Sequence, residues 1–217
     1  MPFTADWFSH NIPNWKVWLA DLKGREGACC LEVGAFEGRA SVWLLTNVLT
    51  HPTSRMTCCD LWSGAIQGNY ADTGEQVEAR FDENLRPFAG RFEKRKGDSF
   101  EFLAALALAG RRFDGIYIDG DHYGSEVLRD AVLAFTLLRP GGILIFDDYL
   151  WRMPIVRVFP GEAIDAFLHV FRHEISVVAK GSQVAIRKNE VEKPCLNALP
   201  STQTLPPGAA KWGVLDP

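Results

Sequence analysis

From Ala28 to Lys188 the chain alternates short strand-like segments with segments of helical length. Each of the first five strand-like segments ends in glycine or acidic residues before the next segment begins. This alternation predicts parallel strands whose connecting helices cover both faces of one sheet. The last segment, EISVVAKGSQVAIRK, alternates on both sides of Gly181 and predicts an antiparallel hairpin. We therefore expect an α/β fold: a doubly wound, mostly parallel, seven-stranded sheet with a terminal antiparallel hairpin.

The 217 residues suit one main domain with small additions at each end. Residues 1–24 are rich in tryptophan and are expected to form a helical cover, with its helix over about 13–22. Residues 25–188 form the predicted domain. Residues 189–217 carry five prolines with little periodicity, so we expect a disordered tail or one laid loosely over the domain.

Composition excludes several classes of function. The net charge of −4 and the lack of a basic stripe argue against nucleic acid as a partner. No apolar run approaches the roughly 18–20 residues of a membrane span, and the first residues lack the pattern of a secretory signal. The cysteines lack zinc-ligand spacing and predict reduced thiols in a cytoplasmic protein. They are Cys29, Cys30, Cys58, Cys59 and Cys195.

The first strand-like segment leads into the loop LEVGAFEGRAS. Gly34 and Gly38 flank a tight turn before a helix, where missing side chains would let a ligand approach the backbone. Ala35 leaves Gly-x-x-x-Gly, which is not the dinucleotide pattern, and Arg39 stands where a phosphate loop needs Gly-Lys-Ser. A diphosphate ligand is therefore disfavoured. Glu32, the acidic residue just before this turn, is a candidate for binding a different ligand. A plain structural turn remains the alternative.

The next two strand ends are also acidic. Asp60 lies 22 residues beyond Gly38, close to the spacing at which a carboxylate meets a ribose hydroxyl pair. The third strand end offers Asp98 and Ser99, which could equally cap the following helix.

Together these strand ends resemble the class I S-adenosylmethionine-dependent methyltransferases, over roughly Ala28 to Lys188. The resemblance implies a Rossmann-like sheet. It also implies that the loop backbone and the first acidic residue hold the methionine part of S-adenosylmethionine. Asp60 would bind the ribose, and Asp98 the adenine amino group while Ser99 caps the helix. Asp119, at the fourth strand end, would border the same cofactor.

The fourth and fifth strand ends read IDGDHY and IFDDY. Both strands are expected beside the first, so Asp119 and the pair Asp147–Asp148 should converge. Several carboxylates in one crevice repel one another, and a divalent cation compensates them; an all-oxygen site suits Mg²⁺. The alternatives are acidic residues that bind no metal and a pair that only caps a turn.

At this point the resemblance narrows to the metal-dependent O-methyltransferases of the catechol and caffeoyl type, and especially to the macrocin type. It implies Asp119, Asp147 and Asp148 as metal ligands and His122 as general base. The catechol pattern has lysine at the position of His122 and asparagine at that of Asp148. This departure favours an aliphatic or sugar hydroxyl over a catechol.

The sequence thus predicts an S-adenosylmethionine-dependent enzyme, Mg²⁺-dependent and acting on a hydroxyl of a small, natural-product-like molecule. The alternatives are a metal-independent N- or protein methyltransferase and a non-catalytic binding module of the same fold.

We expect residues 64–90 to include a substrate lid. Ser125 should cap a helix, and Asp121 either binds the metal or orders its turn. The tryptophans Trp7, Trp15 and Trp18 should cover the cofactor edge or the partner in a homodimer.

Overall fold

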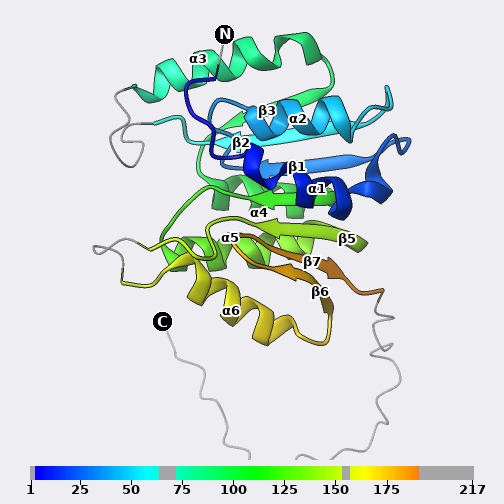
Figure 1. Ribbon diagram of the computed structural model, residues 1–217, viewed down its shortest axis with the longest axis vertical. Coiled ribbons are helices and arrows are strands. Elements are labelled where there is room, and N and C mark those ends of the chain that lie inside the picture. The colour runs from blue at the N-terminus through cyan, green and yellow to red at the C-terminus, as the bar shows by residue number, and fades with distance from the viewer. Residues whose placement is uncertain (1–2, 64–71, 153–156, 191–217) are drawn as a thin grey trace, which may run out of the picture.

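The computed structural model describes residues 3–63, 72–152 and 157–190. Within these ranges seven strands form one sheet in the order β3-β2-β1-β4-β5-β7-β6 (Figure 1). The first five strands run parallel, and β7 is antiparallel to both of its neighbours. The predicted doubly wound sheet with a terminal hairpin is therefore confirmed. The strands are β1 (Cys29–Val33), β2 (Arg55–Asp60), β3 (Phe92–Lys96), β4 (Phe113–Ile118), β5 (Leu138–Phe146), β6 (Ile175–Lys180) and β7 (Val184–Lys188).

Helices cover both faces of this sheet (Figure 1). They are α1 (Ile12–Trp18), α2 (Arg39–Asn47), α3 (Gly74–Leu85), α4 (Ser99–Leu108), α5 (Gly124–Leu137) and α6 (Pro160–Phe171). The helix expected over 13–22 ends at Trp18, and a 3-10 turn follows over Ala20–Leu22. None of the helices within the described ranges has the length and apolar character needed to cross a membrane.

Successive residues of the central strands feed two separate cores. In β5, Ile143 and Ile145 pack with the side chains of α1, α2 and α3. Leu144 and Phe146 pack with those of α4, α5 and α6 on the opposite face. Alternation of side chains across a strand explains why these segments are apolar along their whole length.

One expectation about strand neighbours was wrong. The fourth and fifth strands were both expected beside the first, but only β4 pairs with β1, and β5 lies one strand further out. The register aligns Val33 with Ile118 and Ile118 with Phe146. Asp119 follows Ile118 and Asp147 follows Phe146, so the two aspartates still lie side by side, as expected.

The tryptophans of the N-terminal segment divide into two groups. Trp15 and Trp18 are buried inside the domain and present no surface to a partner subunit. Trp7 is 57% exposed, and its ring packs against Phe36 of the first loop with centroids 4.9 Å apart. Only Trp7 therefore lies where a cover for the cofactor edge was expected.

Two other predicted features fall largely outside the described residues. Residues 64–71 of the expected lid lie outside them, and the rest of that segment is mainly helix α3. Residues 191–217 of the tail lie outside them as well.

Candidate active site

The loop after β1 is held in close backbone contact with the end of β4. Gly34 has φ +85°, and a Cβ atom there would lie 2.0 Å from the carbonyl oxygen of Asp119. Gly38 has φ +79°, and a Cβ atom there would lie 2.4 Å from the Leu85 side chain. The backbone of Asp119 thus leaves no room for a side chain at position 34, and the left-handed backbone favours glycine at both positions. The contact joins the predicted cofactor loop directly to the carboxylate cluster.

Glu32 lies beneath this loop and not in an open crevice. Its side chain is 1% exposed and accepts a hydrogen bond from the hydroxyl of Ser41 on helix α2. Burial, with a smaller contribution from the charge of Asp60, raises the pKa of Glu32 to about 8. The residue therefore ties the end of β1, before the loop, to helix α2, which follows the loop.

Asp60, at the end of β2, organises the same loop from its other side. Its Oδ2 accepts the backbone N–H of Phe36 at 2.8 Å, and its Oδ1 accepts that of Trp62 at 2.8 Å. The indole of Trp62 in turn donates to the Phe36 carbonyl at 2.9 Å. Burial raises the pKa of Asp60 in spite of these hydrogen bonds. Each carboxylate oxygen can accept a second hydrogen bond, which suits a pair of ribose hydroxyls.

The helix cap expected of Ser99 is made by Asp98 instead. Asp98 is the N-cap of α4, with Oδ1 accepting the N–H groups of Phe100 and Glu101 at 2.9 and 3.2 Å. Ser99 is the first helical residue, and its hydroxyl donates to buried Asp130 at 2.9 Å. Aspartate is as good an N-cap as serine, so the earlier residue of the pair took the role. The second oxygen of Asp98 lies 3.7 Å from Arg129 on α5.

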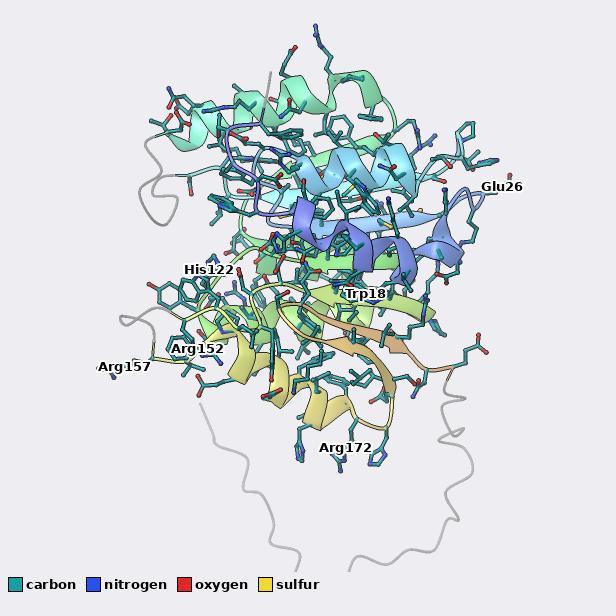
Figure 2. The ribbon with its side chains drawn as sticks, viewed as in Figure 1. Trp18, Glu26, His122, Arg152, Arg157 and Arg172 are labelled. Atoms are coloured by element: carbon teal, nitrogen blue, oxygen red, sulfur yellow. The ribbon has the colours of Figure 1, made fainter. Side chains whose placement is uncertain are left out.

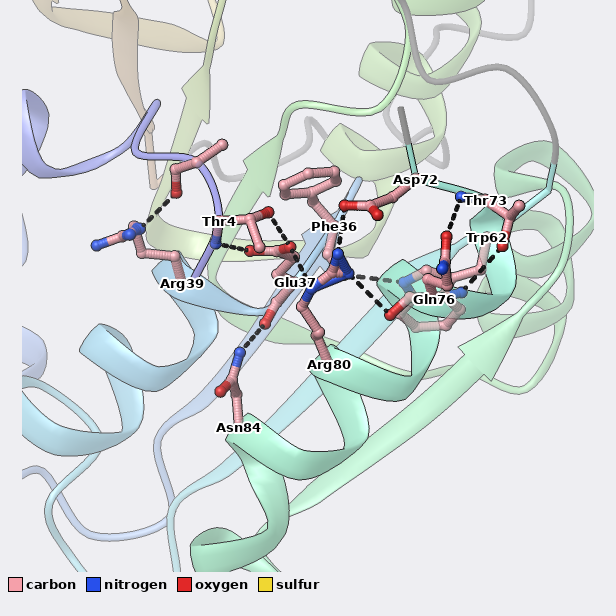
Figure 3. Close-up of polar contacts among 11 residues, drawn as sticks. Thr4, Phe36, Glu37, Arg39, Trp62, Asp72, Thr73, Gln76, Arg80 and Asn84 are labelled. Carbon is pink, nitrogen blue, oxygen red and sulfur yellow. Dashed lines mark hydrogen bonds and ion pairs between the residues drawn. The ribbon is translucent and has the colours of Figure 1, made fainter. Parts of the chain in front are cut away.

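A buried carboxylate ties two segments to the first loop (Figure 3). Glu37 is fully buried and accepts the N–H and the hydroxyl of Thr4 at 2.7 and 2.5 Å. It also pairs with Arg80 of α3 at 3.1 Å, while Asn84 donates to its backbone carbonyl. Arg80 continues to Asp72, at the edge of the described ranges. The loop, the N-terminal segment and α3 thus form one unit.

The carboxylate cluster is built around a tyrosine. Tyr117 lies two residues before Asp119 on the same face of β4. Its hydroxyl is 2.7 Å from Asp119 Oδ2 and also bonds Asp147 Oδ2. Asp147 further accepts Gln183 Nε2 at 2.8 Å and the N–H of Asp148 at 2.8 Å. The two carboxylates therefore meet at one hydroxyl group.

Electrostatics in this cluster disfavours two free charges. Burial, then the charges of Asp147 and Asp148, hold the pKa of Asp119 well above its usual range. Burial also raises the pKa of Asp147. A tyrosine hydroxyl has a single hydrogen, so it can donate to only one of the two carboxylates at a time. A shared proton or a bound cation compensates the remaining repulsion.

Asp148 turns away from this pair toward His122. Its backbone is left-handed, with φ +56°, a conformation that aspartate tolerates better than most residues. Its Oδ2 lies 2.7 Å from His122 Nε2, and the imidazole packs against Trp151 with ring centroids 4.4 Å apart. Figure 2 shows His122 and Glu26, which precedes β1, on opposite sides of the molecule. The imidazole therefore belongs to the carboxyl ends of the strands.

The turn between β4 and α5 contains Asp121 and leads to Ser125. Asp121 accepts the N–H of Tyr123 at 2.7 Å, so it orders the turn before α5. Ser125 is not the N-cap, because α5 begins at Gly124 and its cap position is Tyr123. A Cβ atom on Gly124 would lie 2.6 Å from the Val158 side chain, so glycine suits this first helical position.

The positions of the three aspartates determine whether they could hold a divalent cation. Within the residues that the structure describes, no three His, Cys, Asp or Glu side chains form a ready-made metal site. The predicted set is split, with Asp119 and Asp147 together and Asp148 on His122. Two adjacent carboxylates still match Mg²⁺, which is usually held by one or two carboxylates with several waters. The donor chemistry fits, with Asp148 Oδ1 within the same turn.

Sequence reasoning missed three residues of this site: Tyr117, Gln183 and Glu37. Tyr117 stood in a strand that was interpreted as core, and an alternating pattern does not distinguish a buried hydroxyl from a buried ring. Gln183 lies beyond the hairpin turn, and only the pairing of β5 with β7 brings it to Asp147. Glu37 lay between the two loop glycines and could have drawn attention by position.

The sheet order, the loop after β1 and the acidic strand ends define the class I methyltransferase fold. A family model described as "Methyltransferase domain" matches residues 31–149, more than half of the chain. The protein belongs to this methyltransferase family, and the predicted resemblance is confirmed at that level. No curated protein matches the sequence.

Solved structures share the fold. The O-methyltransferase TomG from Streptomyces achromogenes, in complex with SAM, is 16% identical over 82% of this chain and 80% of TomG, with TM-score 0.61. An O-methyltransferase from Bacillus cereus, in complex with SAH, is 17% identical over 86% of this chain and 84% of its own, with TM-score 0.61. MycE from the mycinamycin biosynthetic pathway, in complex with Mg, SAH and mycinamycin VI, is 15% identical over 85% of this chain, with TM-score 0.57. The chain spans half of MycE. At these identities the similarity concerns the fold.

Proposed function

We propose that the protein transfers the methyl group of S-adenosylmethionine to a hydroxyl of a small molecule, with Mg²⁺ as a second cofactor. The observation that carries this proposal is the contact between the loop and the cluster. Gly34 touches the backbone of Asp119, and the side chain of Asp119 meets Asp147 at the Tyr117 hydroxyl. A methyl donor on the loop would thus lie beside the carboxylates and the imidazole.

The cofactor would occupy the carboxyl ends of β1, β2 and β3. The Asp60 carboxylate lies at the end of β2 for the ribose hydroxyls, and Asp98 lies at the adjacent strand end for the adenine amino group. Glu32 supports the loop that binds the methionine part, where an ammonium group would favour its ionised form. TomG in complex with SAM and the Bacillus cereus enzyme in complex with SAH support this choice of cofactor.

In the proposed reaction the acceptor oxygen attacks the methyl carbon, the O–C bond forms as the S–C bond breaks, and the hydroxyl proton leaves. His122 takes that proton. Because Asp148 faces Nε2, that nitrogen carries the hydrogen and Nδ1 is the basic nitrogen. Trp151 packs on the ring and holds its plane. Orientation of donor and acceptor supplies much of the rate in such a displacement.

The metal would be held by Asp119, Asp147 and the free oxygen of Asp148. When bound it supplies positive charge that compensates the carboxylates and lowers the pKa of an acceptor hydroxyl. The MycE structure in complex with Mg supports this part of the proposal. The imidazole at position 122 favours an aliphatic or sugar hydroxyl, borne by a natural-product-like molecule.

A metal-independent methyltransferase is the second candidate. It is favoured by the separation of Asp148 from the other two carboxylates, since His122 with Asp148 already forms a base and its orienting partner. In this version Asp119 and Asp147 share a proton through Tyr117 instead of binding a cation.

Calorimetric titration with S-adenosylhomocysteine, with and without Mg²⁺, tests both versions. We expect binding in either condition and a separate heat on adding Mg²⁺. Binding of S-adenosylhomocysteine without any heat from Mg²⁺ would leave the metal-independent version. No binding in either condition would refute the proposed function and favour a non-catalytic module.

We also propose a cytoplasmic location, supported by the free thiols of Cys29, Cys30, Cys58 and Cys59.

A further inference from the structure

A chain of buried side chains runs from helix α1 to the carboxylate cluster. The indole Nε1 of Trp15 donates to Gln183 Oε1 at 2.8 Å, and Gln183 Nε2 donates to Asp147 Oδ2 at 2.8 Å. Trp15 is 1% exposed and Gln183 2%. The Trp15 ring also packs edge-on against Tyr117, with centroids 4.8 Å apart, and Tyr117 is the residue that joins Asp119 to Asp147.

The direction of this chain is fixed by chemistry. An indole N–H can only donate, so the carbonyl end of the Gln183 amide must face Trp15. The NH₂ end is then committed to Asp147. Reversing the amide would set donor against donor at one end and acceptor against acceptor at the other, with both groups buried. Trp15 therefore decides that a donor points at the carboxylate.

The strand register explains why these groups meet. β5 pairs antiparallel with β7, with Phe146 opposite Val184, so Gln183 lies opposite Asp147 at the next position. Asp147 is held at both oxygens: Oδ2 by Gln183 and Tyr117, and Oδ1 by the N–H of Asp148. Donors on both oxygens fix the plane of the carboxylate.

We propose that Gln183 and Trp15 are positioning residues of the active site, which hold the Asp147 carboxylate in the orientation that the cluster uses. The proposal deepens the proposed function and rests on it for the identity of the cation. It makes helix α1 part of the active site, although the sequence of α1 carries none of the predicted site residues. It also gives the terminal hairpin a role beyond closing the sheet.

The first test follows the hydrogen bonds directly and requires no metal. In an NMR spectrum of the ¹⁵N-labelled full chain, the indole N–H peak of Trp15 is assigned by its loss in Trp15→Phe. Asp147→Asn should shift this peak more than any other indole peak, because the perturbation travels through Gln183. Asp121→Asn, a conservative change in the neighbouring turn, should leave it in place. An unmoved Trp15 peak in Asp147→Asn overturns the proposal.

The second test measures Mg²⁺ affinity by calorimetry in the presence of S-adenosylhomocysteine. Gln183→Leu removes the amide at similar volume and should weaken Mg²⁺ binding by about 10- to 100-fold, the usual effect of losing a partner of a metal ligand. S-adenosylhomocysteine affinity should be unchanged. Ile186→Val, on strand β7 that follows Gln183 and with its side chain in the opposite core, controls for loss of packing in β7.

The outcomes separate this proposal from the proposed function. Undiminished Mg²⁺ affinity in Gln183→Leu overturns the positioning role. If the wild-type protein takes up no Mg²⁺ but the Trp15 peak still responds to Asp147→Asn, the chain of hydrogen bonds stands and the proposed cation is refuted.

Discussion

The Nε2 atom of His122 lies 2.7 Å from Oδ2 of Asp148, and this pairing separates Asp148 from the other two aspartates at the site. The left-handed backbone of Asp148 turns its carboxylate toward the imidazole. The two aspartates at the end of β5 therefore have different partners: Asp147 joins Asp119 at the Tyr117 hydroxyl, while Asp148 faces the imidazole of His122.

Replacing His122 by alanine should lower the rate of methyl transfer by about 10²–10⁴-fold, the usual contribution of a positioned general base. The rate is measured as formation of S-adenosylhomocysteine with a hydroxyl acceptor. Affinity for S-adenosylhomocysteine should hardly change, because His122 lies beyond the predicted cofactor loop. His51→Ala, which changes a histidine in the loop before β2, is the matched control. A variant that turns over normally but binds the cofactor weakly would assign His122 to the cofactor instead.

Replacing Glu37 by glutamine should destabilise the protein by about 1.5–3 kcal/mol, the range for hydrogen bonds to charged groups. The change keeps the shape of the side chain but removes its charge from Arg80 and Thr4. Urea unfolding measures the loss. Because Glu37 stands in the loop, S-adenosylhomocysteine should also bind more weakly.

The exposed Glu26 provides the control for this experiment, since Glu26→Gln removes the same charge from the surface. Equal unfolding curves for the two variants would mean that the Glu37 network contributes nothing.

The fold could be predicted because its signals are local. Each central strand is apolar along its length and each ends in acidic residues or glycine, so the order of elements follows from the sequence. The placement of β5 beside β4 instead of β1 leaves no local signal in the sequence, but it follows the common strand order of doubly wound sheets, in which the fifth strand lies beside the fourth. The cap of α4 was assigned to Ser99 instead of Asp98 because either residue type caps a helix well.

The sequence pointed to the acidic and imidazole groups of the candidate site but not to the residues that hold them. Asp119, Asp147 and His122 stand at strand ends, where function is expected. Tyr117 and Gln183 are buried within or beside strands, and their roles depend on contacts between residues 30 or more positions apart. Such pairs leave no mark in a single sequence.

The buried Glu32 predicts a dependence of stability on pH. Its pKa is about 8 in the folded protein, above the value near 4.5 expected in the unfolded chain. The folded state therefore binds the proton more tightly, so this residue makes stability fall as pH rises from about 4.5 to about 8. Glu32→Gln removes that fall, and its advantage over the wild type should reach a few kcal/mol above pH 8. Urea midpoints measured across this range give the two curves. Parallel curves would show that Glu32 ionises as freely in the fold as in the unfolded chain.

Replacing Asp119 by asparagine should raise the melting temperature without Mg²⁺ and abolish the stabilisation that Mg²⁺ gives. Without Mg²⁺ the change removes a buried carboxylate that is crowded by Asp147 and Asp148, so the melting temperature should rise. In the wild type, Mg²⁺ should raise the melting temperature, and a chelator should reverse the increase, because a ligand that binds the folded state stabilises it. The variant should lose this response. Asp165→Asn, a change on helix α6 beside Lys180, should keep it. A wild-type melting temperature that ignores Mg²⁺, together with a stabilised Asp119→Asn, would mean that a shared proton and not a metal compensates the cluster.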